Sequence, residues 1–231
     1  IMTKKRVVVT GLGCLTPIGC NKDDFWKSLL EGKSGAKTID FLNVDKLPVK
    51  FSASVKDFQS DKYFDKKDLK KMDLFMQYGM AAGIDAVADA KLLESQCNPD
   101  RIGVSIGSGI GGLYNIENTR DTFIKSGSRR ISPFFVPASI INMISGNLSI
   151  KYGFKGPNLS IVTACTTGTH NIGEGFRQIQ YSHADVMICG GAEMATSDLG
   201  VGGFAAARAL STRNDSPETA SRPWDKDRDG F

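Results

Sequence analysis

The stretch LSIVTACTTGTHNIGEGFRQIQYSHADVMIC, residues 159–189, decides the fold class of this chain. Residues 159–163 are suited to a strand, residues 166–181 to a helix, and residues 184–189 (ADVMIC) to a second strand. Because one helix of about 15 residues joins the two strands, they are expected to run parallel as a βαβ crossover. The stretch therefore predicts an α/β fold whose sheet is covered on both faces.

The rest of the chain extends this alternation. Further strands are expected at residues 6–10 (RVVVT) and 101–106, and further helices at residues 22–31, 70–90 and 140–152. Asn21 is the expected N-cap of the first of these helices, and Gly32 ends it. Residues 33–60 lack a sustained period and are expected to form a long irregular excursion. The whole chain thus predicts helices on both sides of a mostly parallel sheet.

Composition narrows the class of protein. In these 231 residues the apolar runs fall far short of the roughly 20 residues that span a bilayer, so no membrane helix is expected. The N-terminus lacks a signal-type apolar region and reads as mature sequence. Five irregularly spaced cysteines and two histidines argue against a disulfide framework and a metal site, and favour a reducing compartment. The net charge of +4 comes with no nucleic-acid motif.

Two short motifs look functional but lack their context. Residues 107–112 fit the dinucleotide pattern G-x-G-x-x-G, yet residues 127–137 hold no acidic residue to bind a ribose. Residues 225–230 resemble the first half of an EF-hand loop, but no bidentate glutamate follows. Nicotinamide and calcium binding are therefore both disfavoured.

Cys165 is the candidate nucleophile. It lies where a predicted strand meets the N-terminus of a predicted helix, beside unpaired backbone N–H groups and the positive end of the helix dipole. This position favours a thiolate, and the same N–H groups can bind the oxyanion of an acyl-transfer intermediate. A buried structural thiol is the alternative interpretation.

The residues that would activate this cysteine are harder to find. On a common helix His170 would point about 140° away from Cys165, and His183 lies about 27 Å along the helix axis. Neither histidine is a good general base for Cys165. Either the helix dipole alone activates the thiol, or its partners are missing from this chain.

Several longer motifs, in the same order, resemble the N-terminal half of a β-ketoacyl-acyl carrier protein synthase, and among its types they are most similar to the elongating synthase II. The motifs are VVVTGLGCLTPIG (7–19), IGSGIGGL (106–113), TACTTGTHNIG (163–173), GGAEM (190–194), LGVGGFAAARALSTRND (199–215) and SRPWDKDRDGF (221–231).

The resemblance implies a thiolase-like fold, in which two similar halves stack as α-β-α-β-α layers, each with a mostly parallel five-stranded sheet, usually in a homodimer. Residues 1–231 would form the N-terminal synthase domain, with the C-terminal half absent from this chain. The implied activity is an acyltransferase of fatty-acid elongation. Cys165 takes the acyl chain as a thioester, and decarboxylative Claisen condensation with malonyl-acyl carrier protein extends it by two carbons.

The resemblance also assigns individual residues. The backbone N–H of Cys165 would contribute to the oxyanion hole, Ile110 and Phe204 would line the acyl pocket, and Phe135 would reach it across the dimer. Acyl carrier protein would dock on basic residues, namely Lys67, Lys70, Lys71, Arg129, Arg130 and Arg208. Charge alone is less specific, because five lysines and four aspartates between residues 61 and 73 give a net charge of only +1.

The same resemblance implies no resident cofactor and no metal, because the phosphopantetheine arm belongs to the acyl carrier protein. Family members take the two histidines and the lysine of decarboxylation from the C-terminal half, so this chain alone is expected to be inactive. The expected location is the bacterial cytoplasm, with a plastid-type organelle as the alternative. Other functions left open are a polyketide synthase ketosynthase, a thiolase, and a non-catalytic partner subunit of the chain-length-factor type, which typically carries glutamine in place of the nucleophile.

Overall fold

The computed structural model describes residues 5–231, so the first four residues of the expected mature N-terminus lie outside the described residues. The chain divides into two compact units. The sheet unit comprises the chain up to Cys14 together with Gln59–Glu193, and the small unit comprises Leu15–Phe58 and Met194–Phe231. Each unit is described by itself.

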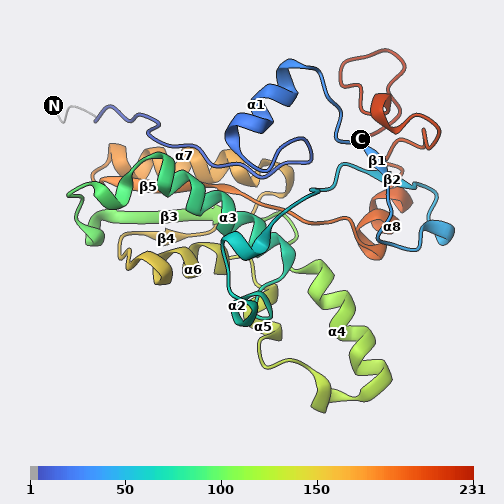
Figure 1. Ribbon diagram of the computed structural model, residues 1–231, viewed down its shortest axis with the longest axis horizontal. Coiled ribbons are helices and arrows are strands. Elements are labelled where there is room, and N and C mark those ends of the chain that lie inside the picture. The colour runs from blue at the N-terminus through green and yellow to red at the C-terminus, as the bar shows by residue number, and fades with distance from the viewer. Residues whose placement is uncertain (1–4) are drawn as a thin grey trace. The chain divides into compact units, whose positions relative to one another are not determined.

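A parallel three-stranded sheet forms the centre of the sheet unit. Its strands are β3 (Ile102–Gly107), β4 (Asn158–Leu159) and β5 (Val186–Gly191), in the order β4-β3-β5 (Figure 1). Val104 lies beside Asn158 of β4 and Ile188 of β5. Every residue of β3 is buried, which fits its apolar sequence and its place at the centre of the sheet.

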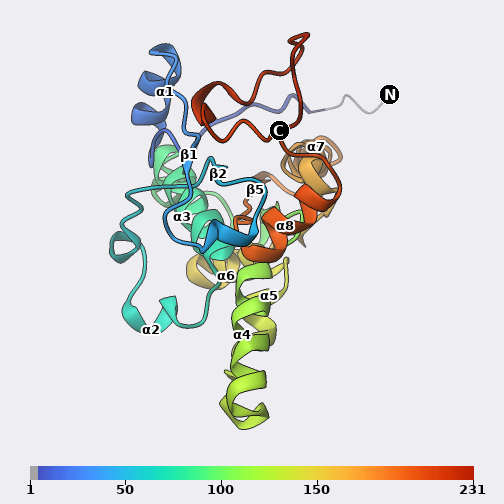
Figure 2. The same cartoon turned by 90° about the vertical axis from the view of Figure 1, so that its right-hand side faces the viewer.

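Helices cover both faces of this sheet, as the sequence predicts. The chain moves from β3 outward to β4 and then returns past β3 to β5, so two right-handed crossovers must place their helices on opposite faces. Helix α6 (Met143–Tyr152) packs on β3 and against α3 (Leu74–Asp89), while α7 (Thr167–Gln180) packs on β3 and β5. Figure 2 shows α3 and α7 on opposite sides of the sheet.

The core of the sheet unit lies between α3, α6 and the strands. Phe75, Met76, Ile144 and Leu148 are fully buried there. The helix predicted for residues 70–90 therefore packs into the core. The helix itself begins at Leu74, because the Asp73 side chain accepts a hydrogen bond from the backbone N–H of Phe75 and so caps it.

Helix α7 approaches β5 closely at one glycine. A Cβ at Gly175 would overlap the Sγ atom of Cys189 on β5, whereas a Cβ at Gly173, two residues earlier, would meet nothing. The glycine thus lets the helix settle directly on the strand. Burial in this contact raises the pKa of the Cys189 thiol to about 12.

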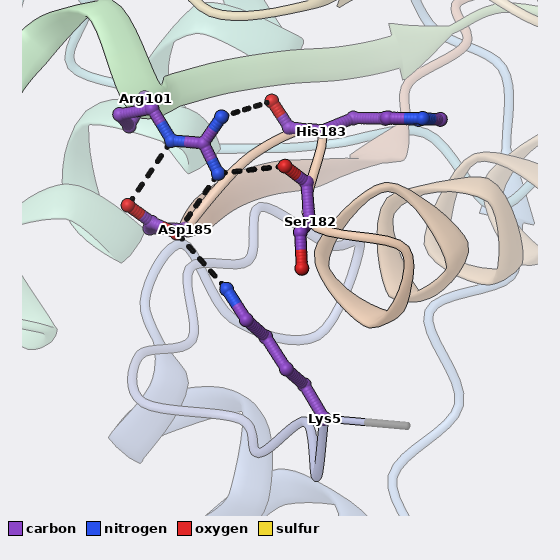
Figure 3. A network of polar contacts seen from close by, with 5 residues as sticks. All are labelled: Lys5, Arg101, Ser182, His183 and Asp185. Carbon is purple, nitrogen blue, oxygen red and sulfur yellow. Dashed lines mark hydrogen bonds and ion pairs between the residues drawn. The ribbon is translucent and has the colours of Figure 1, made fainter. Parts of the chain in front are cut away.

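An ion-pair network joins the start of β3 to the turn between α7 and β5 (Figure 3). The Arg101 guanidinium donates to the carbonyl oxygens of Ser182, at 2.8 Å, and His183, at 3.1 Å, and also to the Asp185 carboxylate. Lys5 lies 3.4 Å from the same carboxylate. The hydrogen bond from Arg101, with help from Lys5, lowers the pKa of Asp185.

Short helices lie beyond the sheet in the same unit. They are α2 (Lys66–Leu69), α4 (Leu113–Ser126) and α5 (Phe135–Ser139). Helix α4 extends away from the sheet, with α5 beside it (Figure 1). The exposed apolar residues of α4 include Ile116, Phe123 and Ile124.

The small unit holds α1 (Lys22–Leu30), α8 (Asp198–Ala206) and a short antiparallel pair, β1 (Lys37–Thr38) with β2 (Phe51–Ser52). Asn21 caps α1 as predicted, since its side chain accepts a hydrogen bond from the N–H of Asp24. Ile39, Val49 and Val201 form the core of this unit. The excursion predicted for residues 33–60 is thus mostly irregular, and the two-residue strands within it were too short to give a sequence signal.

The strand predicted at residues 6–10 is wrong. In residues 5–231 this segment is extended but pairs with no strand, and Val8 and Val9 are 60% and 78% exposed. The residues that follow it, 11–13, lie against α3, where the N–H of Leu12 donates to the Asp89 carboxylate. Strand propensity is realised only when a neighbouring strand supplies hydrogen bonds. The described residues accordingly contain three strands of the five that the resemblance implies for this sheet.

The strand predicted at residues 159–163 is also shorter than expected, because β4 ends at Leu159. The N–H and C=O of Ile161 bond instead to the side chain of Asn171. Within residues 5–231 no disulfide joins any of the five cysteines. No helix in the described part of the chain is both long and apolar enough to cross a membrane.

Candidate active site at the turn before α7

Cys165 lies in a tight turn between β4 and α7. The turn is a 3-10 helix, Ala164–Thr166, and α7 begins at the next residue. Ala164 has φ +53°, a left-handed conformation that costs a non-glycine residue about 1 kcal/mol. The side chain of Cys165 is exposed beside the N-terminus of a 14-residue helix. This is the strand-to-helix setting that the sequence predicts for a nucleophile.

Three hydrogen bonds hold the turn in this shape. The N–H of Thr163 donates to Thr167 Oγ1 at 2.9 Å, and the N–H of Thr166 donates to the carbonyl of Thr163 at 3.1 Å. The Thr163 hydroxyl lies 2.6 Å from Nδ1 of His170. His170 therefore bonds the residue two positions before the nucleophile, and its ring supports the turn.

Asn171 joins the turn to the sheet. Its side chain is fully buried and takes part in four hydrogen bonds. The amide oxygen accepts from the Ser105 hydroxyl and the N–H of Ile161, while the amide nitrogen donates to the carbonyls of Ile161 and Thr167. One side chain thus ties β3, the chain before Cys165 and the first turn of α7 together.

The glycine-rich turn after β3 lies directly against Ala164. A Cβ at Gly109 would come within 3.1 Å of the Ala164 carbonyl oxygen, so a larger residue here would crowd the turn. The carboxylate of Glu193 accepts hydrogen bonds from the Ser108 hydroxyl at 2.8 Å and from the N–H groups of Ile110 at 2.9 Å and Gly111 at 3.3 Å.

These contacts also explain why the G-x-G-x-x-G pattern does not indicate a dinucleotide site. The N–H groups of Ile110 and Gly111, which would face a pyrophosphate, are bonded to a carboxylate of the protein itself. A second anion would meet the negative charge of Glu193. The glycine-rich turn after β3 is therefore interpreted as a structural element that packs beside the turn of Cys165.

Comparison with known proteins identifies the family. The profile described as "Beta-ketoacyl synthase, N-terminal domain" matches residues 4–231. The chain belongs to the β-ketoacyl synthase family. It is 56% identical over 230 residues to the 3-oxoacyl-[acyl-carrier-protein] synthase 2 of Vibrio cholerae and 54% identical to that of Coxiella burnetii. All of this chain aligns in both comparisons, and it covers 56% of each relative, so it spans about half the length of these synthases.

Solved structures agree with this assignment. A β-ketoacyl synthase from Burkholderia phymatum superposes with a TM-score of 0.85 at 28% identity, covering 99% of this chain and 56% of that one. The ishigamide ketosynthase/chain length factor also gives 0.85, at 26% identity and the same coverage. The predicted fold class, a thiolase-like α/β fold with a mostly parallel sheet, is confirmed.

The resemblance seen in the sequence predicts an acyl pocket lined by Ile110, Phe135 and Phe204, and the structure places these residues in different elements. Ile110 is 40% exposed in the glycine-rich turn, in the same unit as Cys165. Phe135 begins α5, and its carbonyl accepts from Asn115 and Ser139. Phe204 lies on α8 in the small unit, with its ring edge-on to Phe231 at 5.2 Å. Within the sheet unit, Ile110 directly follows Gly109, whose backbone lies against Ala164 in the turn of Cys165.

The basic residues that synthases of this family would use for docking also lie on separate elements. Lys67 is on α2, and Lys70 and Lys71 follow it. Lys71 pairs with Asp68 at 2.7 Å and lies over the ring of Phe134. Arg129 and Arg130 form an exposed turn at the far end of α4, about 21 Å from its start at 1.5 Å per residue. Arg208 is exposed in the small unit.

The remaining candidates have other contacts. His183 Nδ1 lies 3.1 Å from Gln178 Oε1, at the end of α7 opposite to Cys165. In the EF-hand-like segment, Asp229 pairs with Arg213, and hydrogen bonds from Ser211 and Arg213 lower its pKa. Asp225 accepts from the N–H of Asp227. These carboxylates stabilise a loop of the small unit.

Sequence reasoning missed Asn171 and Glu193 as parts of the site. Both lie inside motifs that carried the family resemblance, TACTTGTHNIG and GGAEM. An asparagine in a helix interior is only a weak indication of a functional role. It is neutral or unfavourable for helix stability unless its side chain has a hydrogen-bond partner. Only the folded chain shows those partners.

Proposed function

We propose that the protein carrying this chain is a 3-oxoacyl-acyl carrier protein synthase of fatty-acid elongation, of the type II class. The observation that carries this proposal is Cys165, exposed at the N-terminus of α7 in a chain that is 56% identical throughout to a synthase of that name. A lone thiol in such a turn suits acyl transfer through a covalent thioester.

In the first step the Cys165 thiolate attacks the carbonyl carbon of an acyl thioester on the carrier protein. The backbone N–H of Cys165, at the positive end of α7, stabilises the oxyanion that forms. Collapse of that intermediate breaks the bond to the phosphopantetheine sulfur, which leaves as a thiolate and takes a proton from the solvent. The acyl chain then remains on Cys165 as a thioester.

In the second step malonyl-carrier protein loses carbon dioxide, and its carbanion attacks the Cys165 thioester. The new carbon–carbon bond gives a 3-oxoacyl product, and Cys165 leaves as a thiolate. We assign neither His170 nor His183 to this step, because the first bonds Thr163 and the second bonds Gln178. The reaction needs no resident cofactor, since the carrier protein brings the phosphopantetheine arm.

We further propose that acyl carrier protein docks through Lys67, Lys70, Arg129, Arg130 and Arg208, which are exposed. Carrier proteins are acidic, so complementary charge would speed encounter. Lys71 is expected to contribute less, because Asp68 and the Phe134 ring already engage its ammonium group. We also propose a homodimer, which would bury the exposed Phe123, Ile124 and Val136.

The decisive experiment uses the full natural polypeptide with acyl- and malonyl-carrier protein. Cys165→Ala is expected to abolish 3-oxoacyl product, measured by mass spectrometry of the carrier-bound chains. Cys97→Ala is the matched control, because Cys97 is also an exposed thiol but lies outside the turn. Normal turnover in the Cys165 variant would refute the proposal.

Two related functions remain as alternatives. Structures of an ishigamide ketosynthase/chain length factor and of a type II polyketide ketosynthase bound to its acyl-carrier protein superpose on this chain at 26% identity. Cys165 disfavours a chain-length factor, which typically has glutamine at that position. Preference for a β-ketoacyl primer over saturated chains would favour a polyketide enzyme, and cleavage of acetoacetyl-CoA would favour a thiolase.

A further inference from the structure

Glu193 accepts three hydrogen bonds beside the nucleophile turn. It lies just after β5, and its two carboxylate oxygens accept from three groups of the turn after β3. Oε1 accepts from the Ser108 hydroxyl and the Gly111 N–H, and Oε2 accepts from the Ile110 N–H. The Ser108 hydroxyl is within 3.1 Å of the Gly111 N–H as well, so the turn closes around the carboxylate.

Steric contact transmits this arrangement to the nucleophile turn. A Cβ at Gly109 would lie 2.8 Å from Glu193 Oε2 and 3.1 Å from the Ala164 carbonyl oxygen. Gly109 is thus held between the carboxylate and the residue before Cys165. The position of Ile110, the next residue, is fixed relative to Ala164 by the same contacts.

We propose that Glu193 is a positioning residue: by holding residues 108–111 against Ala164, it keeps the Ile110 side chain where a long acyl chain must pass on its way to Cys165. The inference rests on the proposed function, since it takes an acyl chain as the substrate. It predicts that Glu193 governs selectivity for chain length and leaves the basic reactivity of the thiol unchanged.

A carboxylate is required for this role. Three donors converge on it, and a carboxylate offers only acceptor sites. In Glu193→Gln the new NH₂ group would face at least one of these N–H or O–H donors, so the turn would lose a contact and shift. Glu193→Asp keeps both acceptor oxygens but shortens the side chain by one carbon, so partial recovery is expected.

The test measures alkylation of Cys165 without any carrier protein. In the full natural polypeptide, rate constants are measured at Cys165 by peptide mass spectrometry with iodoacetamide and with its N-octyl derivative. Each reaction forms one S–C bond and releases iodide. Glu193→Gln is expected to lower the octyl rate by about tenfold, because a displaced Ile110 side chain no longer orients the octyl chain. The iodoacetamide rate is expected to stay within about twofold of the wild-type value.

Matched variants separate this role from simple destabilisation. Glu94→Gln changes an exposed glutamate on the turn after α3 and is expected to change neither rate. Ser108→Ala removes one donor and is expected to lower the octyl rate less than Glu193→Gln. The double variant should be less than additive, because both changes break the same contact. If Glu193→Gln does not fold, the two alkylation rates are measured in Ser108→Ala and Glu193→Asp, where the octyl rate is again expected to fall more than the iodoacetamide rate.

Several results would overturn the inference. One is an unchanged or increased ratio of the octyl rate to the iodoacetamide rate in Glu193→Gln. Another is an equal loss in both rates of that variant together with a lower melting temperature. The third is a wild-type protein that reacts no faster with the octyl reagent than with iodoacetamide. Failure of the proposed function is a separate result, because it is judged by 3-oxoacyl product formation in the Cys165→Ala comparison.

Discussion

At the scale of single residues, the strained conformation of Ala164 persists because hydrogen bonds between the neighbouring residues hold it in place. Ala164 adopts φ +53° while Thr163, Thr166 and Thr167 share hydrogen bonds around it. Strain of this kind is found at functional sites whose surroundings compensate for its cost. The candidate nucleophile, Cys165, lies in a preformed turn, so binding a substrate would not have to order that turn.

Asn171 gives the clearest prediction at this scale. Asn171→Ala is expected to destabilise the protein by about 2–4 kcal/mol, because it leaves buried groups of Ser105, Ile161 and Thr167 without partners. Urea denaturation would measure the change. Asn118→Ala on α4 is the control, since Asn118 is exposed and its replacement by a good helix former should cost little. Equal effects of the two changes would contradict this account of Asn171.

At the scale of elements, α7 packs on β5 through the face that carries Gly175. Gly175→Ala is expected to destabilise the protein by about 1–3 kcal/mol, because its Cβ would overlap Cys189 Sγ in a packed contact. Gly173→Ala, on the exposed side of the same helix, should be neutral or stabilise by up to about 1 kcal/mol through helix propensity. Thermal unfolding of the pair measures the difference, and a loss of stability in the Gly173 variant alone would reverse the assignment of faces.

The Arg101–Asp185 network gives a pH dependence to the junction between α7 and β5. The hydrogen bond from Arg101 lowers the pKa of Asp185 in the folded chain, so the unfolded chain binds the proton more readily. The stabilisation is therefore complete above the ordinary carboxyl pKa and is lost as pH falls through the lowered value. Asp185→Asn should lower the free energy of unfolding at pH 7. It should also make that free energy fall less steeply as the pH is lowered.

Unfolding midpoints from pH 7 to pH 3 measure this effect. Asp121→Asn is the matched control, because the ion pair of Asp121 in the described residues is with Arg120 and both side chains are largely exposed. Parallel curves for the wild type and the Asp185 variant would show that the network does not contribute to acid sensitivity.

At the scale of the whole molecule, the chain matches the N-terminal domain of β-ketoacyl synthases. Both of its histidines are bonded elsewhere, to Thr163 and Gln178, and it spans 56% of its Vibrio cholerae relative. Residues 1–231 expressed alone are therefore expected to give no detectable 3-oxoacyl product. The same assay on the full natural polypeptide is the positive control, and product formation by the shorter chain would show that its own residues suffice for decarboxylation.

The sequence by itself determined the fold class, the family and the candidate nucleophile. Parallel strands at 102–107 and 186–191, the helix of residues 167–180 and the cap at Asn21 follow from periodicity and capping, which are local. The Cys165 turn was predictable for the same reason, since a thiol between a strand and a helix is visible in eight residues.

Only the tertiary structure decided what these local signals do in the folded chain. The RVVVT segment has strand propensity but pairs with no strand in residues 5–231, and β4 stops early because Asn171 takes the backbone groups of Ile161. Glu193 meets the glycine-rich turn across 82 or more positions of the chain. Local propensity cannot report such contacts, because hydrogen-bond partners distant in sequence are chosen when the chain packs.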